Sequence, residues 1–153
     1  MNINYKNLEI WQLSYKFMVE IYDLTRSFPT YEENNMSSQL RRASLSVPVN
    51  IAEGSASPSN RDFFKFLCIA YKSAKECECL ILAARDVGYV KPEKHAELSA
   101  LLDHAAAKLY KYLKRVEEIC GFHGFEYNQG YKRRYCSGTT RPPIDMGLTT
   151  ENR

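Results

Sequence analysis

The chain has 153 residues, of which 44% are hydrophobic and 25% charged, a composition typical of one globular domain. Its formal net charge of +3 permits an anionic partner without requiring one. No apolar run reaches the roughly 18 residues of a transmembrane helix, and the N-terminus lacks the apolar core of a signal peptide. The five cysteines are odd in number and show no paired spacing, so we expect a cytoplasmic protein without a membrane partner.

Glycine and proline divide the first 120 residues into four pieces of helix length. The breaks fall at Pro29, at Gly54 and Pro58, at Gly88 and Pro92, and at Gly121. No stretch alternates polar and apolar residues for long enough to predict a strand.

The first predicted helix, residues 8–27, carries two apolar stripes whose centres lie about 120° apart around the helix. One stripe consists of Leu8, Trp11, Tyr15, Met18 and Tyr22. The other consists of Ile10, Leu13, Phe17, Ile21 and Leu24. One stripe can face the core of a bundle, and the other needs a partner, either a further helix or another subunit.

The second predicted helix, residues 36–54, has Asn34 or Asn35 as its N-cap. Its apolar line is Met36, Leu40, Ala43, Val47 and Ile51. Pro48 lies within this pattern, where it removes a backbone hydrogen bond and is expected to kink the helix.

The third predicted helix begins after Ser59, which with Asp62 resembles a capping box, and ends near Val87 with Gly88 at the C′ position. Its apolar residues repeat at spacings of four and three, which is a heptad seam rich in small side chains: Phe63, Leu67, Ala70, Ala74, Cys77, Ile81 and Ala84.

The fourth predicted helix starts at Pro92, a favoured first-turn residue, and ends before Gly121. Its predicted buried face is Leu98, Leu101, Ala105, Leu109, Tyr112, Val116 and Ile119. Four amphipathic helices joined by short turns predict an all-α, up-down-up-down four-helix bundle over residues 5–120. The remaining segment, residues 121–153, is an aromatic and basic tail without periodicity, and from Ser137 its composition is typical of disorder.

No residue pattern predicts catalysis or a metal centre. Cys77 and Cys79 point about 160° apart on a helix, so they cannot share a metal ion. Cys120, His123 and Cys136 have no evident fourth ligand. Because nucleophile, zincin and P-loop motifs are absent, the sequence predicts neither an enzyme nor a cofactor nor a small-molecule substrate.

Basic side chains form stripes on the third and fourth predicted helices. Arg61, Lys65, Lys72 and Lys75 fall within about 80° of one another, and Lys108, Lys111 and Arg115 within about 60°. Such stripes can track a phosphate backbone. The alternative is a solvated face that serves solubility.

The tail adds a second basic candidate. Lys132, Arg133 and Arg134 lie among tyrosines between Tyr127 and Tyr135. Aromatic rings can stack on unpaired bases while the cations hold phosphates. Equally, the tail can fold back on its own bundle.

The second predicted helix also carries a polar line, Gln39, Arg42, Ser46, Asn50 and Glu53. At the surface such a line needs no explanation. If it is buried, its residues need partners from another helix or another subunit, so the line is a candidate structural element or oligomer interface.

Residues 39–54, QLRRASLSVPVNIAEG, resemble the hallmark of the four-helix bundle proteins encoded by 23S rRNA intervening sequences. Further agreement comes from LEIWQ at residues 8–12, Phe28-Pro29 followed by Glu32 or Glu33, FFKFL at 63–67, SAKE at 73–76 and Gly88-Tyr89. Met36 stands where leucine is more usual, and the tail is longer than in other members.

This family is similar to the accessory variability (Avd) protein of diversity-generating retroelements. The resemblance implies a ring-like homopentamer without catalysis, whose partners include nucleic acid and a reverse transcriptase. We therefore expect a non-enzymatic oligomeric bundle that binds structured RNA, DNA or a ribonucleoprotein through its basic helix faces. The alternative is a protein-interaction scaffold, such as a reverse-transcriptase adaptor.

Overall fold

The computed structural model describes residues 4–121, and within that range it is all-helical, with no strand. The four α-helices are α1 (Glu9–Leu24), α2 (Met36–Ser55), α3 (Asn60–Asp86) and α4 (Pro92–Ile119). Three short 3-10 helices accompany them, η1 (Tyr5–Asn7), η2 (Thr25–Ser27) and η3 (Thr30–Glu32). The predicted elements are therefore confirmed to within a few residues.

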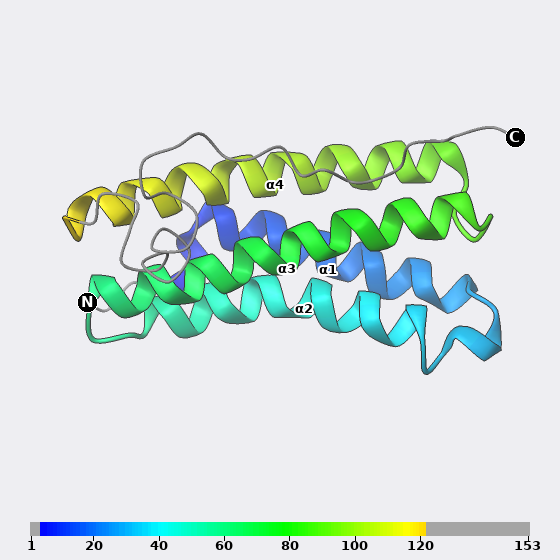
Figure 1. The fold of residues 1–153 in the computed structure, drawn as a ribbon, viewed down its shortest axis with the longest axis horizontal. Coiled ribbons are helices and arrows are strands. Elements are labelled where there is room, and N and C mark those ends of the chain that lie inside the picture. Colours follow the sequence, from blue (N-terminus) through cyan, green and yellow to red (C-terminus); the bar gives the residue numbers. More distant parts are fainter. Residues whose placement is uncertain (1–3, 122–153) are drawn as a thin grey trace, which may run out of the picture. The chain divides into compact units, whose positions relative to one another are not determined.

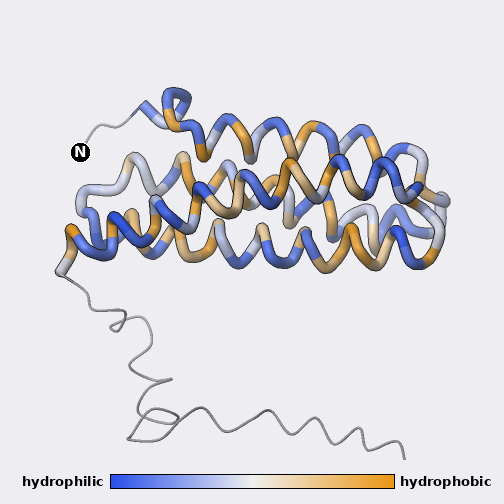
Figure 2. Tube along the Cα trace, turned by 90° about the horizontal axis from the view of Figure 1, so that it is seen from above, coloured by the Kyte–Doolittle hydropathy of each residue, from blue (hydrophilic) through white to orange (hydrophobic). Residues whose placement is uncertain are grey.

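The four helices run alternately in opposite directions and form an up-down-up-down bundle (Figure 1). Helix α1 packs against α2 and α4, and α3 packs against the same two helices. The α2–α3 pair and the α1–α4 pair consequently lie on opposite sides of the bundle. Positions alternate between hydrophobic and hydrophilic along every helix, as amphipathic segments require (Figure 2).

The predicted signals at the ends of α3 act locally as expected. The Ser59 hydroxyl accepts a hydrogen bond from the backbone N–H of Asp62 at 3.1 Å. Gly88 has a φ of 84°, and the N–H of Tyr89 donates to the Ala84 carbonyl at 2.8 Å. This is the Schellman arrangement, in which glycine adopts the left-handed conformation.

The start of α2 differs from the expectation. Asn35 occupies the N-cap position, but its side chain makes no capping bond to the backbone. Instead, the buried Glu32 carboxylate accepts hydrogen bonds from the Met36 N–H at 3.1 Å, from the Asn35 side chain at 2.9 Å and from the Tyr89 hydroxyl at 3.0 Å. One carboxylate thus joins the start of α2 to the turn after α3.

The core contains one of the two stripes on α1. Ile10, Phe17 and Ile21 of the second stripe are buried. In the first stripe, Tyr15 and Tyr22 are 45% and 37% exposed, although Met18 is buried. Leu8 and Trp11 are half-buried, so this stripe is only partly covered. Every residue of the heptad seam on α3 is buried, as predicted.

The prediction for α4 was wrong at its end, because Ile119 is 62% exposed while Leu102 and Leu113 are buried. The reason is the axial offset between α4 and α1. Lys108 pairs with Glu9, the first residue of α1, so the last turns of the antiparallel α4 extend past the start of α1. No facing turn of α1 covers them.

Helices α2 and α3 approach closely where α2 ends. A Cβ atom at Gly54 would lie 2.7 Å from Phe63 Cδ2 and 2.8 Å from Phe66 Cβ, so only glycine fits this position. Farther back, Pro48 is buried inside α2, which continues through it to Ser55.

Candidate functional site

The two predicted basic stripes do not share one surface: the stripe on α4 and the stripe on α3 lie on different sides of α4. Lys108 forms an ion pair with Glu9 of α1 at 2.8 Å. Two residues later, Tyr110 packs against Tyr71 of α3, with 5.6 Å between ring centroids. Since two residues rotate a helix by about 200°, the α4 stripe lies toward α1, away from the α3 stripe.

On α3, Lys65 and Lys75 are paired with acids of the same helix. Lys65 lies 3.0 Å from Asp62, and Lys75 is hydrogen-bonded to Glu78, which raises the pKa of Lys75. Arg61 and Lys72 are exposed on the same helix. Lys65 and Lys75 would thus have to leave a carboxylate to bind phosphate.

On α4, Lys111 and Arg115 are exposed and form no ion pair with any residue in the described range. They lie one turn apart near the uncovered end of the helix. Tyr112 lies between them in sequence and is half-buried. Burial raises the pKa of its hydroxyl, and this effect outweighs the positive charge of Arg115, which lowers that pKa. These two cations are available to an external anion.

A hollow of about 480 Å³ opens beside them, where α4 extends past the start of α1. We call it the basic hollow; it is lined by Asn7, Leu8, Glu9, Ile10, Lys108, Lys111, Tyr112 and Arg115. Leu8 occupies the N-cap of α1 and offers no side-chain acceptor, so the positive end of that helix adds to the field of the three cations. The Glu9 carboxylate opposes it but is held by Lys108.

A second depression, of about 530 Å³, lies on the outer side of α4 and shares Lys111 and Arg115 with the basic hollow. Its other lining residues are Tyr110, Lys114, Glu118 and Ile119. Lys114 is paired with Glu117 at 2.6 Å. Lys111 and Arg115 therefore form a ridge between two concave surfaces, which we call the cationic ridge.

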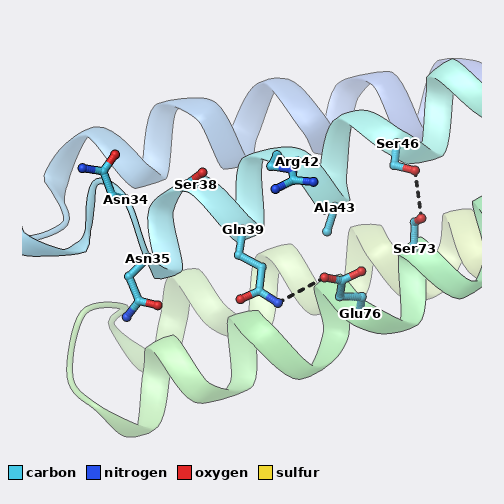
Figure 3. Close-up of a pocket in the computed structure, with 9 residues that line it drawn as sticks. All are labelled: Asn34, Asn35, Ser38, Gln39, Arg42, Ala43, Ser46, Ser73 and Glu76. Carbon is cyan, nitrogen blue, oxygen red and sulfur yellow. Dashed lines mark hydrogen bonds between the residues drawn. The ribbon is translucent and has the colours of Figure 1, made fainter.

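On the opposite side of the bundle, a groove of about 430 Å³ runs between α2 and α3 (Figure 3). This polar groove is lined by Asn34, Asn35, Ser38, Gln39, Arg42, Ala43, Ser46, Ser73 and Glu76. Gln39 donates to Glu76 at 3.3 Å, and the Ser46 and Ser73 hydroxyls are 2.9 Å apart. Arg42 forms no ion pair with the residues from 4 to 121.

The predicted polar line is split by this groove. Gln39, Arg42 and Ser46 line it, whereas the Asn50 amide donates to the Ser46 carbonyl of its own helix at 2.7 Å. Glu53 is exposed farther along α2. The line is thus a surface feature of the single chain.

The adjacent Arg41 was missed by the sequence analysis. Its guanidinium donates to Glu33 at 2.7 Å and to the Thr25 hydroxyl at 2.8 Å, and it lies 6.0 Å from the centroid of the Tyr22 ring. Arg41 fastens α2 to the end of α1, while Arg42 faces the polar groove. Nothing in the Arg41-Arg42 dipeptide distinguishes these roles.

The two buried thiols of α3 are poor nucleophiles, because burial raises the pKa of Cys68 to about 11 and that of Cys77 to about 12. Within residues 4–121, no three His, Cys, Asp or Glu side chains gather as metal ligands would. His123, Cys136, Lys132, Arg133 and Arg134 lie outside the described residues. None of the described helices is long and apolar enough to cross a membrane.

A family model described as 23S rRNA-intervening sequence protein matches residues 6–111. The chain is also similar to a crystal structure of a protein of unknown function from the S23 ribosomal protein family of Bacteroides thetaiotaomicron. The TM-score is 0.64 at 25% sequence identity, and the match covers 69% of this chain and 95% of that chain. No curated protein matches the chain.

Proposed function

Because the chain belongs to the 23S rRNA-intervening sequence protein family, we propose that it is a non-enzymatic, oligomeric cytoplasmic bundle that binds structured RNA or a ribonucleoprotein. The contact surface centres on the cationic ridge of α4. Lys108 flanks it. A secondary contribution comes from the α3 cations Arg61, Lys65, Lys72 and Lys75 on the other side of α4, and from Lys132, Arg133 and Arg134 outside the described residues.

The observation that carries this proposal is that Lys111 and Arg115 have no carboxylate partner in the described part of the chain. A cation that is already paired with a carboxylate must give up that pair to neutralise a phosphate, so its net contribution is smaller. An unpaired cation releases counterions from the nucleic acid without that loss. We therefore expect the ridge to supply more binding free energy per charge than Lys65 and Lys75 of α3.

The test compares two double variants that remove equal charge. Lys111→Gln with Arg115→Gln is expected to lower affinity for a folded RNA about tenfold and to reduce the slope of log K against log salt by about 2. The matched control, Lys65→Gln with Lys75→Gln on α3, is expected to lose less than half as much. Binding would be titrated at several salt concentrations. Unchanged affinity in the ridge variant, or equal losses in both, would refute the assignment.

We also propose that the uncovered face of α1 and α2 joins copies of the chain, in the homopentameric ring that the family resemblance implies. Tyr15 and Val19 are exposed on α1, and Leu45 and Val49 are exposed on α2. The contact of Arg41 with Tyr22 sets the antiparallel register of the two helices. One turn farther along, Val19 lies level with Leu45, and after a second turn Tyr15 lies level with Val49. Val19→Glu with Leu45→Glu should yield monomers by light scattering. A wild-type monomer would refute this assembly.

The same apolar face supports the alternative function, a protein-interaction scaffold such as a reverse-transcriptase adaptor. A monomeric chain would leave this face to a different protein. The two functions separate in a pull-down treated with nuclease, because an RNA-bridged partner is lost and a directly docked protein stays.

A further inference from the structure

The basic hollow differs from an ordinary charged surface because its floor is apolar. Ile10 is buried and Leu8 and Tyr112 are half-buried, whereas Lys111 and Arg115 are exposed at the rim. The volume of about 480 Å³ falls within the range of pockets that hold small organic groups, about 300–1,000 Å³. The hollow thus has an apolar floor and a cationic rim.

An RNA duplex can contact the cationic rim of the hollow but not its apolar floor. Its phosphates can reach the rim, but its bases are stacked inside the helix and cannot contact Leu8 or Tyr112. An unpaired nucleotide can turn its base outward into the hollow while its flanking phosphates stay on Lys111 and Arg115. Apolar and aromatic side chains favour such bases by contact with their faces.

The polar groove on the other side of the bundle provides the contrast. Of its nine lining residues only Ala43 is apolar, and none is aromatic. Its cation Arg42 forms no ion pair within the described part of the chain, but the groove has no apolar surface on which a base can lie. The combination of unpaired cations with an apolar floor distinguishes the basic hollow.

We infer that the basic hollow takes a single unpaired nucleotide of RNA, with its base against Leu8 and Tyr112 and its phosphates on Lys111 and Arg115. This inference rests on the proposed function and names its substrate class, a bulge or loop in preference to a continuous duplex.

The experiment uses the full chain and two RNA stems of equal length that carry 2-aminopurine at the same place, either bulged or paired. The bulged stem is expected to bind about tenfold more tightly, with a change in 2-aminopurine fluorescence on binding. Tyr112→Ala should abolish this preference. Because Tyr112 also packs on Phe63, Leu8→Asn is the second variant: it makes the floor polar while placing a preferred N-cap residue on α1. Tyr110→Ala, on the far side of α4, is the control and should retain the preference.

The outcomes separate the inference from the proposed function. Equal, steeply salt-dependent binding of both stems would overturn the inference and leave the proposed function standing. A bulge preference that survives both Leu8→Asn and Tyr112→Ala would overturn it as well. Failure to bind either stem at low salt would overturn both.

Discussion

The two opposite sides of the bundle are held together in different ways. Helices α2 and α3 approach closely at Gly54, which lies against Phe63 and Phe66, and are joined farther along by the Ser46–Ser73 and Gln39–Glu76 hydrogen bonds. Helices α1 and α4 are joined at their edges by long charged side chains, in the ion pairs Lys94–Glu20 and Lys108–Glu9, both 2.8 Å.

This difference explains why the candidate RNA surface lies on the α1–α4 side. Close contact between α2 and α3 leaves a groove lined almost entirely by polar side chains. On the other side α1 has 16 residues and α4 has 28, so α4 projects beyond its neighbour and leaves cations and an apolar floor uncovered. A difference in helix length thus creates the candidate surface without any special motif.

The largest expected effect of a single substitution breaks the close α2–α3 contact. Gly54→Ala should lower the free energy of unfolding by about 2 kcal/mol, because overpacking against Phe63 and Phe66 outweighs the helix propensity that alanine adds. Gly88→Ala, which meets no atom within 4 Å but has a φ of 84°, should cost about 1 kcal/mol from backbone strain alone. Urea denaturation measures the free energy of unfolding of both variants, compared at an unchanged slope of that free energy against urea concentration. A stabilised Gly54→Ala variant would contradict the close contact.

The next effect concerns the carboxylate that caps α2 beside the polar groove. Glu32→Gln should lower the free energy of unfolding by about 1 kcal/mol, because an amide cannot accept from the Met36 N–H, the Asn35 amide and the Tyr89 hydroxyl together. Hydrogen exchange at Met36 should accelerate, whereas exchange in the middle of α4 should change only as much as global stability does. Unchanged protection at Met36 would show that Glu32 is not the cap.

The smallest effect tests the ion pairs that join α1 to α4. Lys94→Gln should cost about 0.5 kcal/mol, and less in high salt, because the pair is partly exposed. Lys91→Gln, at the start of the same helix, should cost nothing measurable. The hydrogen bond to Glu20 raises the pKa of Lys94, so its contribution is complete below the ordinary lysine pKa and disappears as pH rises through the higher folded value. A cost that salt does not reduce would point to packing instead.

Most of the fold could be predicted because its signals are local. Ser59, Gly88 and Pro92 end or begin helices through contacts within a few residues, and the heptad seam of α3 identifies its own buried face. The candidate site was predictable only as a list of cations. Which of them already have partners depends on geometry: Lys65 and Lys75 pair along α3, and Lys108 pairs across the bundle.

The sequence by itself determined four helices, their order and the amphipathic face of each, because turns, caps and periodicity act over a few neighbouring residues. It also carried the family signature in α2. The tertiary structure decided which stripe of α1 enters the core, that Arg41 fastens two helices while Arg42 faces a groove, and how far α4 extends past α1. These outcomes depend on contacts such as Lys108 with Glu9, 99 positions apart, which no local pattern encodes.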